Sequence, residues 1–455
     1  MKTRFCSIIC VIFLLFGSIG ALSSCNSDNA VGIISAEINE DGELVLVYSD
    51  GNEQNLGVVV GKDGTNGVDG KDGADGANGE NGTNGSDGSI TITTSGSNIP
   101  VASSKGLRSA VSIVCKFQAT VQQGGWRPGS GSTTTKDYSS EGSGVIYQMD
   151  KANGDAFIIT NYHVVYDASS NTENGISNDI SVYLYGSEIE EKAIKATYVG
   201  GSLYYDIAVL RVEDSEILAA SSACAVTAAD SDEIVVGDGA IAIGNAQGLG
   251  ISSTSGVISV DSEYITMTAA DEKTKVSFRV MRVDTAINSG NSGGGLYDDE
   301  GNLIGIVNAK IIYDGVENIG YAIPSNVAVS IAENIIDYCY GTDTERVQRA
   351  FLGITVSALD SKAVYDSTTG LISIKETVSV YEVSSGSLAD GVLQAGDVLV
   401  SATINGNTTE ITRQYHIIDM MLDVRVGDTV VLNILRDGEE LTVNIQIAED
   451  CLMAY

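Results

Sequence analysis

Short runs of apolar and β-branched residues alternate with glycine and acidic turn residues along most of the chain. Runs of this kind are typical of β-strands and the turns between them. They are so regular between residues 107 and 340 that an all-β domain is expected there, and at this length a barrel is favoured over a sandwich. The runs are GVIYQ, AFIITN, ISVYLYG, YDIAVLRV, GAIAIG, GVISV and NLIGIVNA.

Helical spacing is confined to a few segments. Residues 325–340 follow Pro324 and place apolar side chains at helical intervals, which predicts a helix that closes the all-β domain. A second helix is expected at residues 412–422. Residues 33–60 instead predict short strands, because turn signals such as Glu40-Asp41-Gly42 separate their apolar runs.

The first 24 residues have the pattern of an export signal. Lys2 and Arg4 precede an almost entirely apolar stretch, which is too short to span a bilayer but suits the core of a signal peptide. The segment ends in Leu22-Ser23-Ser24-Cys25, which resembles a bacterial lipobox, so Cys25 is expected to carry lipid and hold the protein on a membrane. The alternative is an ordinary secreted protein cut near Ala21.

Glycine then recurs at every third position from Gly61 to Gly88, in a G-x-y period that resembles collagen-like repeats. A triple helix needs glycine at its axis, but this run has no proline to preset the extended backbone and would be weak alone. A flexible acidic spacer is therefore favoured. Residues 89–105 are rich in Ser and Thr without a helical period, which predicts a linker, and residues 25–60 form a separate β-rich segment.

Composition excludes several function classes. The 455 residues suggest about three domains. Because 60 acidic residues oppose 25 basic ones, the net charge of −35 excludes the positive surface of a nucleic-acid-binding protein. The two histidines, His163 and His416, are too few for a histidine-built metal site. The cysteines outside the signal and lipid site show no CxxC spacing, and their pairing is left open. They are Cys115, Cys224, Cys339 and Cys451.

Three short segments hold the residue types of nucleophilic catalysis. His163 ends an apolar strand in ITNYHVV, Asp206 opens another in YYDIAVL, and Ser292 lies in the glycine-rich segment NSGNSGGG. Each alone is ambiguous, since it could be a structural histidine, a solvated acid or a simple turn. Together, the order His, Asp, Ser with tens of residues between members is that of chymotrypsin-type enzymes, not of subtilisins or α/β-hydrolases.

These segments resemble the catalytic motifs of the HtrA (Deg) family of serine proteases, namely TNYHVV, YDIAVL and DTAINSGNSGGGL, and GYAIPSN resembles its barrel-closing segment. The resemblance extends from Leu107 to the last residue. It implies a mostly β fold, with a chymotrypsin-like double β-barrel protease domain over residues 106–341. Tyr162, Ser289 and Gly295 depart from the family's usual residues, but none replaces a reacting group.

The resemblance implies a role for each reacting residue. Ser292 is the nucleophile, His163 the base that takes its proton, and Asp206 the carboxylate that orients the imidazole. The backbone N–H groups of Gly290 and Ser292 would meet the oxyanion, since glycine lets the loop turn sharply. No metal or other cofactor is implied.

The resemblance also locates the primary substrate pocket, with Ala286 at its base and the strand Ile306-Val307-Asn308 on its wall. No acid stands at position 286, so we expect cleavage after small to medium aliphatic residues, not after Lys or Arg. Residues 122–142, which include the single Trp126, lie where this family has a regulatory loop.

Residues 342–455 resemble a PDZ domain, a small β-barrel with helices, through RAFLGI, ADGVLQAGDVL and VVLNILRDG. Such domains add a peptide as an extra strand and hold its C-terminal carboxylate with backbone N–H groups, here those of Leu352, Gly353 and Ile354. His416 lies near the start of the expected helix, where packing is favoured over contact with a peptide.

Together these patterns predict an exported, membrane-anchored serine endopeptidase that acts on unfolded or misfolded polypeptides, on the bacterial surface or facing the periplasm. The PDZ domain is expected to bind C-terminal peptides and to adjust activity. The resemblance further implies a homotrimer, which a G-x-y segment would support. The alternative is a proteolytically silent chaperone or peptide-binding protein built on the same folds, but the intact Ser, His and Asp argue against it.

Overall fold

The structure is a computed structural model that describes residues 33–39, 43–49, 51–58, 98–123, 132–309 and 319–455. The expected signal peptide, Cys25 and the G-x-y segment lie outside these ranges, as does Trp126. The chain divides into two units, residues 1–90 and residues 91–455. Among the described residues, no helix is long and apolar enough to cross a membrane.

The first unit contains a small antiparallel sheet. Its strands follow one another in the order β1 (Ile33–Ile38), β2 (Glu43–Tyr48) and β3 (Glu53–Val58). These three strands lie within residues 33–60, where the sequence predicted short strands.

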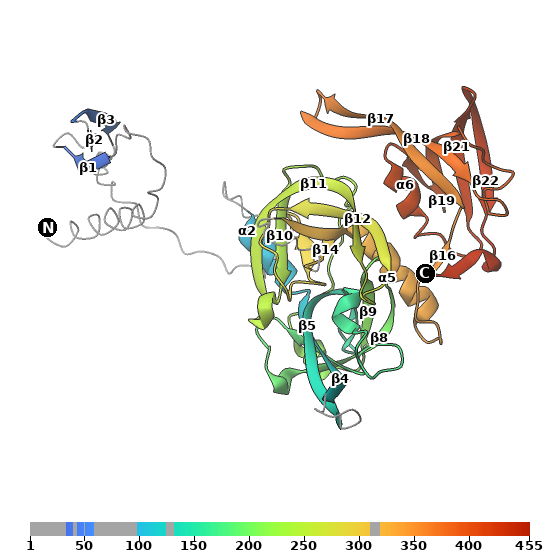
Figure 1. Ribbon diagram of the computed structural model, residues 1–455, viewed down its shortest axis with the longest axis horizontal. Helices are drawn as coiled ribbons and strands as arrows, with labels where there is room; N and C mark the ends of the chain where they lie inside the picture. The colour runs from blue at the N-terminus through green and yellow to red at the C-terminus, as the bar shows by residue number, and fades with distance from the viewer. Residues whose placement is uncertain (1–32, 40–42, 50, 59–97, 124–131, 310–318) are drawn as a thin grey trace, which may run out of the picture. The chain divides into compact units, whose positions relative to one another are not determined.

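Two closed six-stranded barrels form the body of the second unit (Figure 1). The first has the strand order β4-β5-β6-β9-β8-β7 and the second the order β10-β11-β12-β15-β14-β13. Their buried aliphatic side chains form the barrel cores, which confirms the expected double barrel and mostly β fold. The first barrel comprises β4 (Ala110–Gln123), β5 (Ser132–Asp150), β6 (Asp155–Thr160), β7 (Asp179–Leu184), β8 (Ile194–Ser202) and β9 (Ile207–Val212). The second comprises β10 (Gly239–Gly244), β11 (Ser252–Thr268), β12 (Lys275–Val283), β13 (Gly295–Tyr297), β14 (Leu303–Val307) and β15 (Gly320–Pro324).

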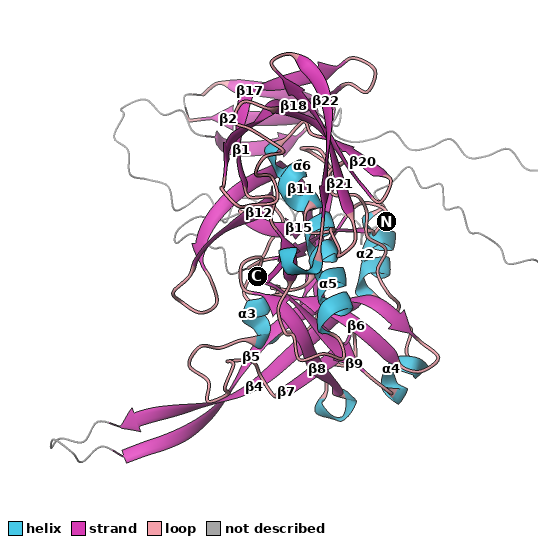
Figure 2. Ribbon diagram, turned by 90° about the vertical axis from the view of Figure 1, so that its right-hand side faces the viewer, coloured by secondary structure: helices cyan, strands magenta, loops and turns pink. Residues whose placement is uncertain are grey.

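The β4–β5 hairpin extends well away from the first barrel (Figure 2). It occupies part of the expected regulatory insertion, because β5 begins at Ser132 and is already paired with β4 there. The part of residues 122–142 that the structure describes is therefore strand. Shorter helices connect the remaining strands. They are α3 (Tyr162–Val165), η1 (Glu190–Lys192), α4 (Glu216–Ala220) and η2 (Ala246–Gly248).

Helix α5 (Ser325–Cys339) confirms the helix predicted after Pro324. It packs against β8 and β9 of the first barrel and against β14 and β15 of the second. Helix α2 (Ile99–Leu107) corrects the prediction of a linker without helical structure up to residue 105. Its buried positions are Ala102, with only a methyl group, and Gly106, with no side chain, and these contribute little to a hydrophobic pattern.

The last part of the chain folds around an open sheet with the strand order β17-β18-β19-β21-β22, with β20 beside β19. A separate two-stranded ribbon pairs β16 with β23. Helix α6 (Gln414–Met420) lies within the helix expected at residues 412–422. The elements are β16 (Gln348–Ala350), β17 (Ile354–Asp366), β18 (Leu371–Val383), β19 (Val398–Ile404), β20 (Asn407–Glu410), β21 (Thr429–Arg436), β22 (Glu439–Gln446), η3 (Glu449–Cys451) and β23 (Leu452–Ala454).

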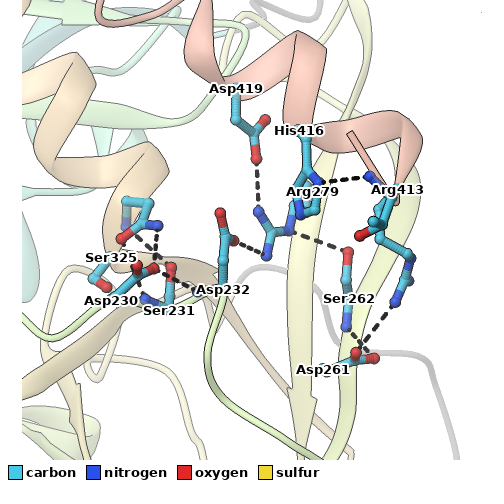
Figure 3. Close-up of polar contacts among 12 residues, drawn as sticks. Asp230, Ser231, Asp232, Asp261, Ser262, Arg279, Ser325, Arg413, His416 and Asp419 are labelled. Carbon is cyan, nitrogen blue, oxygen red and sulfur yellow. Dashed lines mark hydrogen bonds and ion pairs between the residues drawn. The ribbon is translucent and has the colours of Figure 1, made fainter. Parts of the chain in front are cut away.

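Charged side chains join α6 to the second barrel (Figure 3). Arg279 on β12 is 2% exposed, and its guanidinium lies 2.6 Å from Asp232 and 2.7 Å from Asp419. It also lies over the ring of Tyr415, 3.5 Å from the centroid. Arg413 lies 3.3 Å from Asp261 of β11. Burial raises the pKa of Asp419 to about 6, although Arg279 acts in the opposite direction.

The cysteines of the folded parts are unpaired thiols in the described residues. Burial raises the pKa of both Cys115 and Cys339 to about 12. Within the same residues there is no group of three or more His, Cys, Asp or Glu side chains that could hold a metal ion.

Candidate active site

His163 and Asp206 come together from two neighbouring strands of the first barrel. His163 lies on α3, directly after β6, and Asp206 lies directly before β9, which pairs with β6. The imidazole Nδ1 lies 2.6 Å from Oδ2 of Asp206. The backbone N–H of His163 donates to Oδ1 of the same carboxylate at 3.0 Å. The carboxylate therefore holds both the ring and the backbone of the histidine.

The backbone of Asp206 is itself held in an uncommon conformation. Its φ is 55°, in the left-handed region that aspartate tolerates better than most residues. The side-chain amide of Asn161 donates to its carbonyl at 2.8 Å, and the side-chain amide of Asn308 donates to its Oδ2 at 2.8 Å. Asp206 is 6% exposed, and its carboxylate is fixed by the backbone N–H of His163 and the side-chain amide of Asn308.

Ser292 lies in a tight loop that ends at β13 of the second barrel. Gly290 and Gly293 both have left-handed backbones, with φ of 93° and 83°. A Cβ at Gly290 would lie 2.2 Å from the carbonyl oxygen of Asn245, so only glycine fits there without a shift. Among the described residues, the N–H groups of Gly290 and Ser292 donate no hydrogen bond, which leaves both available to an oxyanion.

The hydroxyl of Ser292 accepts the backbone N–H of Ala309 at 3.3 Å. Asn308, the residue before Ala309, donates to the carboxylate of Asp206. Two consecutive residues after β14 therefore contact Asp206 and Ser292. In the part of the chain that the structure describes, Ser292 makes no hydrogen bond to His163. Catalytic hydrogen bonds often form fully only when the substrate is bound.

Known proteins are similar to this chain over both of its folded domains. Residues 142–306 match the model of the trypsin-like peptidase domain, and residues 350–447 match that of the PDZ domain. The chain is 34% identical over 333 residues to the serine protease Do-like HtrA of Lactococcus lactis subsp. cremoris (strain MG1363), which covers 70% of this chain and 74% of that protein. The chain belongs to the HtrA family of serine proteases.

Other HtrA proteins are also similar. The periplasmic serine endoprotease DegP of Escherichia coli (strain K12) is 30% identical over 335 residues, or 73% of this chain and 62% of that protein. The solved structure of the HtrA-type protease AlgW with decapeptide is 26% identical, covers 78% of this chain and 98% of that chain, and has a TM-score of 0.48.

The residues predicted for the HtrA substrate pocket differ in burial and contacts. Ala286 is exposed, and its carbonyl accepts the hydroxyl of Thr254 at 3.0 Å. The side chains of Ile306 and Val307 instead lie fully buried in the barrel cores. Strand β14 is buried on both faces, so consecutive side chains enter hydrophobic cores. Asn308 contacts the carboxylate of Asp206, a role that the pocket assignment did not predict.

Other polar residues of this HtrA site were missed by sequence reasoning. Ser143, Thr160 and Asn161 are all at most 1% exposed. Thr160 donates its hydroxyl to the carbonyl of Ser143 at 2.7 Å, and so joins β6 to β5 near His163. The sequence indicated them only in that each is a polar residue at a position where the strand pattern predicts a buried side chain. Burial raises the pKa of neighbouring Tyr162 to about 12, so its phenol stays protonated and is no candidate base.

The PDZ domain has a groove between its predicted carboxylate loop and α6. Residues 349–356 line one side, and Gln414, Ile417, Ile418 and Met421 line the other, around a cavity of about 360 Å³. Among the described residues, the N–H groups of Leu352 and Gly353 have no hydrogen-bond acceptor, and β17, which begins at Ile354, pairs only with β18. The predicted loop residues therefore lie at the end of a free strand edge. His416 bonds within its own domain, through Nδ1 to the N–H of Thr412 at 3.3 Å.

Proposed function

We propose that this HtrA serine protease is an exported, lipid-anchored endopeptidase that cleaves unfolded or misfolded polypeptides with the triad Ser292, His163 and Asp206. The observation that supports this triad is the 2.6 Å contact between His163 and Asp206, in a site where Ser292 lies between two glycines with left-handed backbones. This arrangement suits acyl transfer, because the carboxylate fixes the imidazole that must accept the serine proton.

In the proposed mechanism, Oγ of Ser292 attacks the substrate carbonyl while Nε2 of His163 takes the hydroxyl proton. Asp206 accepts the hydrogen bond from Nδ1–H and stabilises the imidazolium. The N–H groups of Gly290 and Ser292 receive the oxyanion. The C–N bond then breaks, His163 gives its proton to the leaving amine, and the ester left on Ser292 is hydrolysed by a water that His163 activates.

The PDZ groove is proposed to bind the C-terminal ends of polypeptides and to adjust the activity. A peptide would add as a strand to the free edge of β17, with its carboxylate at Leu352, Gly353 and Ile354. Apolar side chains on the α6 side of the groove favour a hydrophobic last residue.

Membrane attachment is proposed through lipid on Cys25, outside the cytoplasm. The lipobox-like segment supports it, and the relative from Escherichia coli is named a periplasmic enzyme. We also propose that the protein forms a homotrimer. For the primary pocket, small to medium aliphatic side chains are proposed, because position 286 is alanine.

The test is cleavage of casein and labelling by a fluorophosphonate, for wild type, Ser292→Ala and His163→Ala. Both variants should lose cleavage by on the order of 10⁴-fold or more, because triad members act as a unit. His416→Ala is the matched control, since it removes the other histidine of the chain and should retain serine-dependent cleavage.

Cleavage that survives in Ser292→Ala would contradict the assigned nucleophile. A folded wild type that neither cleaves nor labels, even with hydrophobic C-terminal peptides added, would favour the silent chaperone or peptide-binding role.

A further inference from the structure

Ser143 is a buried serine of the first barrel that contacts the oxyanion loop of the second. It lies on β5 and is 1% exposed. Its Oγ donates to the carbonyl oxygen of Gly290 at 2.7 Å and accepts the backbone N–H of Asn245 at 2.8 Å. Its own backbone N–H donates to the carbonyl of Ser292 at 2.8 Å. One residue therefore holds the carbonyl groups on both sides of Asn291.

The direction of the carbonyl groups in this loop decides where its N–H groups point. A peptide group is planar, with C=O and N–H on opposite sides. The Ser289 carbonyl accepts the N–H of Gln247 at 2.7 Å, and this contact orients the N–H of Gly290. The Gly290 carbonyl belongs to the next peptide group, whose N–H is that of Asn291 and donates to the carbonyl of Asn288 at 3.0 Å. Ser143 therefore holds the peptide groups on both sides of the one that bears the N–H of Ser292. Because glycine has no Cβ to restrict rotation at position 290, these contacts help to fix the loop.

The glycines beside Ser143 allow the close approach that these contacts need. A Cβ at Gly142 would lie 2.6 Å from Val164, on the helix that carries His163. A Cβ at Gly144 would lie 2.8 Å from Ile113. Strand β5 therefore lies tightly against its neighbours, and the serine hydroxyl is the one side-chain polar group of this triplet.

We propose that Ser143 is a positioning residue for the oxyanion hole, acting through the Gly290 carbonyl without touching substrate. The inference rests on the proposed mechanism with Ser292 as nucleophile. Without the hydroxyl, a buried carbonyl and a buried N–H lose their partner, and the peptide group between Gly290 and Asn291 keeps only its contact with Asn288. The two oxyanion donors are then aligned for only part of the time, which slows the chemical step more than it weakens substrate binding.

The test compares full-length wild type, Ser143→Ala and Ser112→Ala on a fluorogenic peptide with an aliphatic residue at the cleavage site. A peptide boronate of the same sequence, which forms a tetrahedral adduct with serine, measures affinity for the oxyanion-like state. Ser112 is the matched control, because it is 2% exposed and its hydroxyl accepts the side-chain amide of Asn245 at 2.7 Å. It contacts Asn245, as Ser143 does, but not Gly290.

In Ser143→Ala, kcat should fall by on the order of 10- to 100-fold, less than for loss of an oxyanion donor itself. KM should change by less than about threefold, and boronate affinity should fall by the same factor as kcat. Ser112→Ala should stay within about threefold of wild type in kcat and in boronate affinity. Thermal unfolding checks that each variant is folded, and Ser143→Cys, which keeps a weak donor of similar size, replaces the alanine variant if that one does not fold.

Unchanged kcat and boronate affinity in the folded Ser143 variant would overturn the inference. Equal losses in the Ser143 and Ser112 variants would also overturn it, since they would indicate a structural role only. If wild type shows no cleavage that depends on Ser292, the proposed function fails together with this inference. If wild type cleaves and the Ser143 variant cleaves equally well, only this inference fails.

Discussion

Single residues with left-handed backbones shape the candidate active site. Asp206, Gly290 and Gly293 all have positive φ, and they lie in or next to the candidate triad. A Cβ at Gly293 would lie 2.2 Å from the carbonyl oxygen of Ser143, so another residue there would displace β5. Aspartate at position 206 is held by hydrogen bonds to its carboxylate and its carbonyl. The residue type at each position indicates which chemistry is possible there. The backbone conformation at that position depends instead on contacts between distant segments.

We expect Asp419 to make the contact between the PDZ and protease domains sensitive to pH. Burial raises its pKa to about 6, above its usual value near 4. A raised folded-state pKa means that the contribution of this carboxyl to stability is fully present at low pH and is lost as pH rises through about 6. Relative to Asp419→Asn, wild type should therefore lose up to about 3 kcal/mol between pH 4 and pH 7.

Thermal unfolding of both proteins from pH 4.5 to pH 7.5 measures this difference. Asp337→Asn serves as the control, because that carboxylate pairs with Arg425 at 2.9 Å but is 55% exposed. It should keep the pH dependence of wild type. Parallel curves for wild type and Asp419→Asn would contradict the role given to Asp419.

At the scale of elements, α2 is the part of the fold that the hydrophobic pattern did not predict. It packs on β10 and β13 through Ala102 and Gly106, and a Cβ at Gly106 would lie 2.6 Å from Ile243. We expect Ala102→Glu to destabilise the second barrel by about 3 kcal/mol or more, because an unpaired carboxylate would enter a buried contact.

Chemical denaturation of Ala102→Glu against wild type tests this expectation. Ser104→Glu places the same side chain on the exposed face of the helix and should change stability by less than about 0.5 kcal/mol. Equal stability of the two variants would mean that α2 does not pack on the barrel.

At the scale of the whole molecule, the proposed trimer and the G-x-y segment can be separated by experiment. The segment has no proline, so it contributes little triple-helical stability alone. We therefore expect a protein that lacks residues 61–88 to sediment as a trimer, like the full chain. A monomer only after the deletion would assign assembly to the segment, and a monomer in both would contradict the trimer.

The sequence by itself determined the strand-rich fold and helix α5, and it predicted the residues proposed to react. These features leave local signals, namely short β-branched runs between turn residues, helical spacing after Pro324, and three motifs in a characteristic order. His163 and Asp206 could be paired from these motifs before any distance was known.

Only the tertiary structure decided which polar residues support those groups. Asn308 and Ser143 contact residues more than 100 positions away in the chain, so no local pattern encodes their partners. The tertiary structure also decided that Ile306 and Val307 are buried in the barrel cores. It likewise decided the pKa of Asp419, which depends on the domain packed against this residue. Strand patterns specify which side chains are buried, but the closure of two barrels against each other determines what each buried polar group meets.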